Sequence, residues 1–409
     1  MVQRPRGTRD FLPDEMEARR MIEGRMREAV RRWGYREVAT PAFEDLSLFT
    51  MRSGQGIIDE MYVFQDKGGR DLALRPELTA PVLRMYVNEA RGLAKPLRWC
   101  YFADCFRYER PQKGRYRQFW QFGVELIGVD TAAADAEVVL VADNAIRSSG
   151  LDYDLKIGHL GLMKHLLADV DEEVRRRVMA FLDKQEFDAL RDYLDAAGLI
   201  ALADPLTRLL AAGTLDEAFA VTGPLPEEAR IREMAALLDA AGVRYSFNFG
   251  IVRGLDYYTG MVFEGFAQNL GAESQIVGGG AYRLAQIFGG DDAPSVGFAI
   301  GFDRVMVALG AVHTRKQKIV GVVSTAEGRP FAFQAAAAFR TAGIRADLDL
   351  SNRGLGAQLA RAAKEADFAV LIGEREAATR TVTIKDLATG TQTEVTIDQA
   401  VRMVIDGSR

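Results

Sequence analysis

The stretch LRWCYFADCFRYERPQKGRYRQFWQFGVELI, residues 97–127, carries the strongest structural signal in this sequence of 409 residues. Its two arms, Leu97–Tyr108 and Gln118–Ile127, alternate apolar side chains with others, and a cationic segment joins them. Alternation of this kind is typical of antiparallel strands with one face covered. The stretch therefore predicts two antiparallel strands of a sheet, joined by a charged loop.

The loop within this stretch, residues 106–119, is rich in cations. It holds five basic residues against one acid, Glu109. Charge runs are most often solvated hairpin tips. Here, however, the cations flank a Pro-Gln-Lys-Gly turn, and Phe119 and Trp120 supply aromatic faces beside them. Arginines for phosphates and an aromatic ring for a base are what a nucleotide needs, and composition alone leaves the two interpretations evenly balanced.

Away from this hairpin the texture of the sequence changes at several points. Residues 160–244 have a helical pattern and are rich in Ala, Leu and charged residues. Strand-like patterns return within residues 245–314. Residues 318–409 alternate apolar strands with helices, which indicates a separate α/β domain with a mixed sheet. The chain exceeds a single hydrophobic core of about 250–300 residues, so several domains are expected.

Shorter elements follow from helical periodicity, from prolines at helix starts and from glycine-rich turns. The pattern predicts helices over 14–33, from Pro76 and over 298–309, strands over 36–40 and 257–266, a hairpin over 61–74, and a glycine turn at 278–280.

Composition limits the possible partners. With 52 Lys+Arg against 57 Asp+Glu, the chain has no overall positive charge that would attract DNA or RNA. A partner that carries phosphates must therefore bind a local cluster of basic residues. Cys100 and Cys105 lie in an apolar alternating run, so we expect two buried free thiols and no metal site formed by the protein. The N-terminus lacks a signal peptide, and no run approaches about 18 apolar residues, so we expect a cytoplasmic protein with no membrane partner.

Five ordered segments resemble the class II aminoacyl-tRNA synthetases, in the form that the histidyl enzymes carry. Residues 106–119 are similar to motif 2, residues 74–79 (LRPELT) to the LRPE-x-T element, and residues 253–260 (RGLDYYTG) to the element that marks histidyl enzymes. Residues 278–282 (GGGAY) resemble the second glycine-rich element, and residues 297–304 (GFAIGFDR) resemble motif 3. One such element would be weak, but five in order over nearly the whole chain are specific.

This resemblance implies a fold and a division into domains. The fold is an α+β catalytic domain, the class II antiparallel sheet flanked by helices, with a helical insertion and a C-terminal α/β domain. Residues 1–159 and 245–314 would be the two parts of the catalytic domain and 160–244 the insertion domain. Residues 318–409 would form the anticodon-binding domain.

The resemblance also implies an activity. The enzyme would activate L-histidine with ATP to histidyl-adenylate and pyrophosphate, then transfer histidine to the 3′ end of tRNA(His). Mg²⁺ would arrive with ATP, held mostly by phosphate and water. A homodimer is expected, because Pro41 follows the first strand where motif 1 of the family forms a dimer interface.

The nucleotide contacts implied by the resemblance are mostly cationic. Arg107 and Arg253 would face the α-phosphate from opposite sides and stabilise charge developing at phosphorus, so both are catalytic candidates. The other expected contacts are Glu109 at the adenine amino group, Arg115 at the outer phosphates, and Phe119 and Arg304 on the two faces of adenine.

For the amino acid, the resemblance implies an acid and a phenol at the imidazole. Glu125 and Tyr258 would satisfy the two ring nitrogens. Glu125 has the strand parity of Phe119 and Gln121, so it shares the face of the nucleotide site. The remaining implied contacts are Glu77, Thr79 and Gln121 at the α-ammonium group, Arg253 and Tyr257 as further histidine contacts, and Gly278, Gly279 and Tyr282 as pocket lining.

One segment departs from the family pattern. Family members usually read Gly-Gly-Gly-Arg-Tyr-Asp, whereas this chain has Ala281 and Arg283 around Tyr282. An acid has become a base, so no family role is carried over to those two flanking positions.

Two alternatives share the fold. One is the catalytically silent paralogue that serves as a regulatory subunit of ATP phosphoribosyltransferase, which generally lacks the C-terminal domain and the RGLDYY chemistry. The other is a tRNA-sensing regulatory module with eroded motif arginines. This chain keeps Arg107, Arg253 and Arg304 together with its C-terminal segment, which favours the enzyme.

Overall fold

The computed structural model describes residues 2–53, 55–183, 186–251, 258–270, 274–312, 318–351 and 353–406. The chain forms two compact units, divided between Val312 and His313. Each unit has its own sheet and its own hydrophobic core. Within the described ranges no helix is both long and apolar enough to cross a lipid bilayer.

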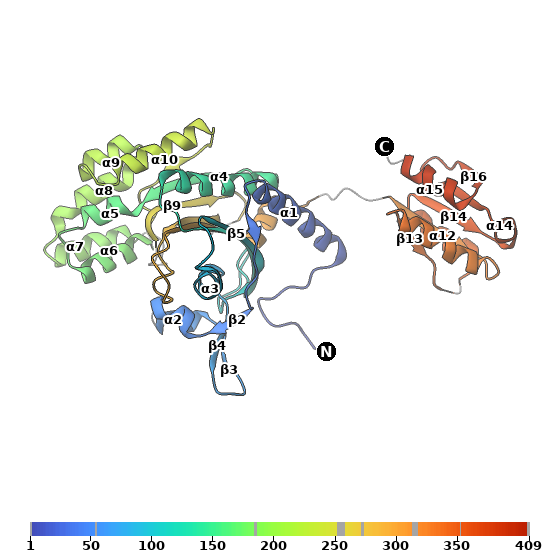
Figure 1. The fold of residues 1–409 in the computed structure, drawn as a ribbon, viewed down its shortest axis with the longest axis horizontal. Coiled ribbons are helices and arrows are strands. Elements are labelled where there is room, and N and C mark those ends of the chain that lie inside the picture. The colour runs from blue at the N-terminus through green and yellow to red at the C-terminus, as the bar shows by residue number, and fades with distance from the viewer. Residues whose placement is uncertain are drawn as a thin grey trace. The chain divides into compact units, whose positions relative to one another are not determined.

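The first unit is built on an eight-stranded sheet (Figure 1). In spatial order its strands are β1 (Arg36–Glu37), β5 (Leu97–Phe106), β6 (Gln118–Ile127), β11 (Ser295–Gly301), β10 (Gln275–Tyr282), β9 (Tyr258–Phe266), β7 (Asp154–His159) and β8 (Ser246–Phe247). Neighbouring strands are antiparallel except at the two ends, where β1 with β5 and β7 with β8 are parallel. The central hairpin is confirmed, because β5 and β6 pair along their whole length.

Two long helices cover one face of this sheet. They are α1 (Pro13–Arg31) and α4 (Ala132–Ser148), which lie side by side in Figure 1. Ile22, Met26 and Val30 of α1 recur every four residues and are buried against the even-numbered residues of β6. Because side chains alternate along a strand, the odd-numbered residues of β6 face away from these helices.

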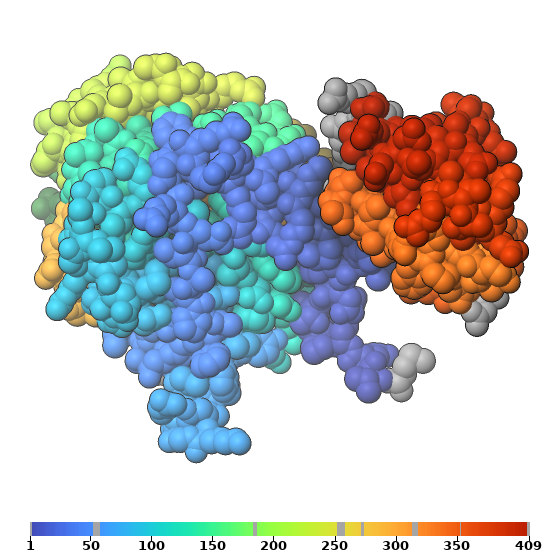
Figure 2. Space-filling view, turned by 45° about the vertical axis from the view of Figure 1, so that its right-hand side comes forward, coloured from blue at the N-terminus to red at the C-terminus, as the bar shows by residue number. Residues whose placement is uncertain are grey.

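A small three-stranded sheet adjoins the large one. Its strands are β2 (Phe43–Asp45), β4 (Asp71–Leu74) and β3 (Val63–Gln65), and the helices around it are α2 (Ser47–Ser53), η1 (Gln55–Glu60), α3 (Thr79–Met85) and η2 (Tyr86–Ala90). The hairpin expected over residues 61–74 is confirmed as β3 and β4. It projects from the surface of the first unit (Figures 1 and 2).

A run of helices follows β7 and lies together at one side of the sheet (Figure 1). It comprises α5 (Leu160–Leu166), α6 (Glu172–Asp183), α7 (Phe187–Ala196), η3 (Ile200–Leu202), α8 (Ala203–Ala211), α9 (Leu215–Thr222) and α10 (Glu228–Ala240). The helical pattern is therefore present, and α10 packs on α4. These helices belong to the same compact unit as the large sheet, so an insertion domain over residues 160–244 stays a prediction.

Two predictions for the second half of the sheet are wrong. Residues 278–280 lie inside β10 rather than in a turn, and residues 298–301 belong to β11, so the helix α11 (Phe302–Leu309) begins only after them. The glycines permit close approach of neighbouring strands, since a Cβ on Gly279 would collide with the carbonyl oxygen of Gly297. Buried apolar strands and helices look alike in sequence, and strand pairing decides between them here.

Two boundaries near the start of the chain also differ. Strand β1 ends at Glu37, earlier than predicted, and α3 begins at Thr79 rather than at Pro76. The Glu77 carboxylate caps α3, because it accepts hydrogen bonds from the backbone N–H groups of Thr79 (2.5 Å) and Ala80 (3.1 Å). The LRPE segment therefore delivers an ordered carboxylate to the helix start.

The second unit is an α/β domain with a mixed sheet, as predicted. Its strands in spatial order are β13 (Arg345–Leu348), β12 (Ile319–Ser324), β14 (Phe368–Ile372), β15 (Val382–Asp386) and β16 (Gln392–Val395). The first three are parallel and the last two antiparallel. Its helices are α12 (Arg329–Thr341), α13 (Leu355–Glu365), α14 (Glu374–Thr379) and α15 (Ile397–Asp406).

Candidate active site

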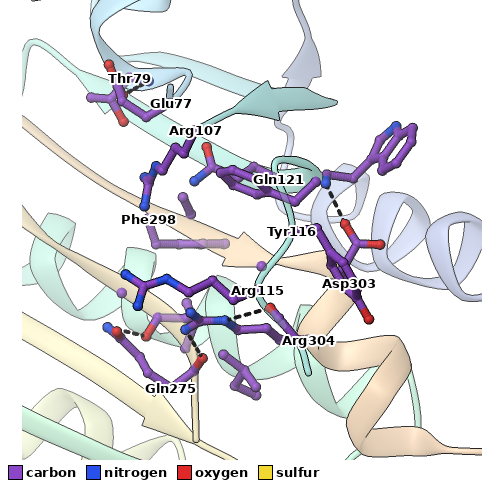
Figure 3. Close-up of a pocket in the computed structure, with 18 of the residues that line it drawn as sticks. Glu77, Thr79, Arg107, Arg115, Tyr116, Gln121, Gln275, Phe298, Asp303 and Arg304 are labelled. Atoms are coloured by element: carbon purple, nitrogen blue, oxygen red, sulfur yellow. Dashed lines mark hydrogen bonds between the residues drawn. The ribbon is translucent and has the colours of Figure 1, made fainter. Parts of the chain in front are cut away.

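A cavity of about 560 Å³ opens in the first unit, a size suited to a small-molecule substrate. Its walls come from the start of α3, the loop between β5 and β6, the cavity-facing residues of β6, and strands β9, β10 and β11 with the start of α11 (Figure 3). The predicted site residues that line it are Glu77, Thr79, Arg107, Glu109, Arg115, Phe119, Gln121, Tyr258, Gly278, Tyr282 and Arg304. All five motif segments therefore contribute residues to one cavity.

The loop between the two central strands supplies cations to one end of the cavity. The Arg107 guanidinium carbon lies 5.2 Å from the centre of the Phe119 ring, and its Nε donates to the carbonyl oxygen of Pro76 at 3.0 Å. Arg115 forms an ion pair with Glu109. The aromatic ring and the arginines thus lie next to each other at this end of the cavity.

Arg304 reaches the same end of the cavity from α11. Figure 3 shows Arg115 and Arg304 entering it side by side from the loop and from the helix. The Arg304 guanidinium donates to the carbonyl oxygens of Gly114 (3.3 Å) and Gln275 (2.8 Å). Arg304 therefore ties the loop to β10 as well as facing the cavity.

Glu125 lies at the other end, beneath the cavity wall. It is 0% exposed, and it accepts hydrogen bonds from the hydroxyl groups of Tyr101 (3.1 Å) and Tyr282. Its carboxyl group fits because Gly297 faces it on β11, where a Cβ would collide with Oε2. Tyr282 lines the cavity and connects Glu125 to it.

Burial raises the pKa of both carboxyl groups in this region. It raises the pKa of Glu125 to about 8, although hydrogen bonds from Tyr282, Thr79 and Tyr101 oppose the shift. A pKa of about 8 means that Glu125 of the free protein is mainly protonated at pH 7. Burial also raises the pKa of Glu77 above its usual range, opposed by the backbone groups that it caps.

Tyr258 stands beside Tyr282, with ring centres 6.2 Å apart and nearly perpendicular planes.

Gly279 does not line the cavity: it packs inside the sheet against Phe263, which corrects its assignment as lining. Arg253 and Tyr257 lie outside the described residues, as does most of the RGLDYY segment.

Both cysteines are buried free thiols, as predicted. Burial raises the pKa of Cys100 to about 11, which keeps it a thiol at neutral pH. The Cys105 Sγ donates to the side-chain oxygen of Gln121 at 3.4 Å. Among the described residues there is no group of three or more His, Cys, Asp or Glu side chains placed to hold a metal ion.

Sequence reasoning missed several residues of the site. Tyr101 was not selected, although it pairs with Gly123 in the central hairpin, and that glycine leaves room for its ring. Tyr116, Trp120 and Asp303 also line the cavity. Asp303 could have been found, because it is the acid of the GFDR sequence and precedes Arg304.

Comparison with known proteins places these features in a family. The family model described as histidyl-tRNA synthetase matches residues 7–305, and the anticodon binding domain model matches residues 316–406. The chain is 91% identical to the histidine–tRNA ligase of Methanosphaerula palustris over the full length of both, and 66% identical to that of Methanoregula boonei over 96% of each.

Solved structures agree with this assignment. The apo histidyl-tRNA synthetase of S. aureus superposes with a TM-score of 0.76 at 30% identity, over 99% of this chain and 100% of that one. A protein of Bacillus halodurans described as an ATP phosphoribosyltransferase regulatory subunit/histidyl-tRNA synthetase has the same TM-score at 28% identity, over 88% and 96%. The chain therefore belongs to the histidyl-tRNA synthetase family.

Proposed function

We propose that this chain joins L-histidine to tRNA(His) in two steps, with ATP as the source of energy. The observation that carries the proposal is the cavity itself, which has arginines and an aromatic ring at one end and the Glu125–Tyr282 pair at the other. Charging of a tRNA(His) transcript with labelled histidine tests it. Charging that requires ATP and histidine supports the proposal, and no charging under any condition contradicts it.

The nucleotide would occupy the cationic end. Arg107 faces the α-phosphate, Arg115 the outer phosphates, and Phe119 and Arg304 the two faces of adenine, with Glu109 at its amino group. Their proximity in one wall supports these roles. Arg253 is proposed opposite Arg107 on the resemblance alone. Mg²⁺ enters as part of the Mg·ATP substrate, held mainly by phosphates and water.

Histidine would occupy the end with the buried carboxyl group. Glu77, Thr79 and Gln121 hold the α-ammonium group, and Glu125 and Tyr258 face the two ring nitrogens. The histidine carboxylate then attacks the α-phosphorus and pyrophosphate leaves, so no protein base is required. In the second step a ribose hydroxyl of the tRNA attacks the acyl carbon and AMP leaves.

The protonation of Glu125 predicts how histidine binding depends on pH. Below about pH 8 Glu125 of the free protein carries a proton, and above about pH 6.5 the imidazole of free histidine is neutral. We expect the bound pair to hold one proton, because this leaves the buried pair without net charge, and we expect this proton to pass from Glu125 to the imidazole. Between these two pH values binding neither takes up nor releases a proton, so the KM for histidine should not vary with pH there.

Outside that window the KM should rise. Above about pH 8 binding must take up the proton that Glu125 has lost, and below about pH 6.5 it must release one from the imidazole of histidine. The KM should therefore rise roughly tenfold per pH unit on each side. Pyrophosphate exchange measured from pH 6 to 9 checks this. A KM that falls steadily through pH 8 would mean that the bound pair holds no proton.

We also propose a homodimer. The first helix and the strand that ends before Pro41 would pack against their twins about a two-fold axis. Strand β1 lies at the edge of the large sheet with Arg36 and Glu37 exposed, which supports this placement. Sedimentation at micromolar concentration should give twice the chain mass. A stable, fully active monomer would rule the dimer out.

The C-terminal unit is proposed to bind the anticodon, with the helices of residues 160–244 against the acceptor arm. A chain truncated near Arg315 should keep histidine-dependent pyrophosphate exchange, because the cavity lies wholly in the first unit. Its tRNA charging should collapse. Loss of exchange in a truncated protein that is still folded would mean that the tail contributes to the chemistry.

A further inference from the structure

The segment before α1 lies against the loop of the nucleotide site. The carbonyl oxygen of Gly7 accepts a hydrogen bond from the backbone N–H of Arg117 at 2.9 Å. Gly7 has a φ of +85°, and a Cβ there would meet the Arg117 side chain at 2.7 Å and Pro111 at 3.0 Å. The chain thus needs a glycine where it passes the loop between β5 and β6.

Arg9 of the same segment reaches the start of α11. Its guanidinium pairs with the carboxylate of Asp303, which is 2% exposed. Its guanidinium carbon also stacks 3.5 Å from the centre of the Tyr116 ring. Tyr116 and Asp303 both line the cavity, and Figure 3 shows them at the same side of it.

Asp303 collects donors from three parts of the chain. Besides Arg9, it accepts hydrogen bonds from Arg19 of α1 at 2.8 Å and from the backbone N–H of Trp120 at the start of β6 at 2.6 Å. Asp303 immediately precedes Arg304, and Tyr116 immediately follows Arg115. Arg9 therefore touches the neighbour of each of two cations proposed to hold ATP.

We propose that Arg9 is a positioning residue for ATP: it clamps the loop of residues 106–119 against the start of α11, so that Arg115 and Arg304 are preorganised. The inference rests on the proposed function, because it concerns the ATP end of that cavity. Arg9 touches no substrate and acts through Tyr116 and Asp303.

Loss of Arg9 should loosen the loop more than it weakens the fold. Asp303 would still accept hydrogen bonds from Arg19 and from the Trp120 backbone, so no buried charge is left unpaired. The loop, however, would lose the guanidinium that stacks on Tyr116, and with it the link that Arg9 makes between Tyr116 and Asp303 of α11. ATP would then have to order the loop on binding, which lowers its affinity.

The experiment compares Arg9→Ala, Arg9→Lys and Arg6→Ala in the full chain. Arg6 lies in the same segment with its side chain exposed, so its replacement is matched in charge and position. In Arg9→Ala the KM for ATP should rise about tenfold, which is the effect expected from the loss of one charge-assisted hydrogen bond. The KM for histidine should stay within about twofold of that of the unmodified chain. Arg9→Lys should recover part of the loss, because lysine keeps the charge but not the planar face. Arg6→Ala should match the unmodified chain.

Hydrogen–deuterium exchange gives a readout that does not depend on activity. Peptides covering residues 107–120 should exchange faster in free Arg9→Ala than in the unmodified chain, and saturating Mg·ATP should restore their protection. An unchanged KM for ATP with unchanged exchange overturns the inference. So does an equal rise in both KM values with a large fall in the unfolding temperature, which indicates a merely structural role.

The two proposals fail in different ways. If the unmodified chain shows no histidine-dependent activity, the proposed function fails, while the exchange comparison without substrate still tests the clamp. If the unmodified chain is active and the loop is equally protected in Arg9→Ala, only the clamp fails.

Discussion

Glu125→Gln should reduce kcat/KM for histidine by roughly 2–4 kcal/mol of transition-state free energy, the value of a charged hydrogen bond plus desolvation. Glutamine has the shape of the neutral carboxyl group that the free protein holds, so Tyr101 and Tyr282 keep their partner and unfolding should change little. What glutamine cannot do is pass a proton to the imidazole and become an anion beside it. The measurement is pyrophosphate exchange at varied histidine concentration.

Tyr258→Phe is the matched comparison at the other ring nitrogen. It removes one neutral partner, so about 1–2 kcal/mol should be lost. The KM for ATP should be nearly unchanged in both variants, because neither side chain is proposed at the nucleotide. Unchanged histidine kinetics in Glu125→Gln would remove Glu125 from the pocket and weaken the choice of histidine as substrate.

Arg107→Ala should slow pyrophosphate exchange by about 10²–10³, the usual cost of one preorganised donor to developing charge. The Arg107 side chain is about one-third exposed. Among the described residues its removal costs the hydrogen bond to the Pro76 carbonyl and a long ion pair with Glu109 (3.9 Å), so the free energy of unfolding should change little. Arg253→Ala is expected to cost a similar factor, on the resemblance alone.

Arg110→Ala is the control for this loss. Arg110 belongs to the same loop and is exposed, so it carries the same charge without facing the proposed phosphates. Its exchange rate should stay close to that of the unmodified chain. Equal losses in the two variants would mean that only the summed charge of the loop matters.

Local pattern predicted the central hairpin and the C-terminal domain, because alternation and helix periodicity report directly on burial. It failed at residues 278–280 and 298–301, where glycines and apolar residues form central strands. Strand β11 pairs with β6, which is far away in sequence, and β10 lies between β9 and β11. This pairing distinguishes the strands from a turn or a helix, and the local sequence pattern does not show it.

The site was predicted by residue type and by resemblance, but its electrostatics were not. The neutral state of Glu125 follows from its complete burial between Tyr101, Tyr282 and the space left by Gly297, which only the folded sheet creates. The contact of Arg9 with Asp303 joins residues almost 300 positions apart. A terminal arginine gives no sign of such a partner.

The most direct test of the account is ATP–pyrophosphate exchange by the purified chain with each of the twenty amino acids in turn. Exchange should occur with histidine and fall by about 10⁴-fold or more with the others, since a pocket that pairs both ring nitrogens leaves its polar groups unsatisfied around any other side chain. Exchange with none of them would match a silent regulatory paralogue, and exchange driven by a different amino acid would contradict the assignment of Glu125 and Tyr258.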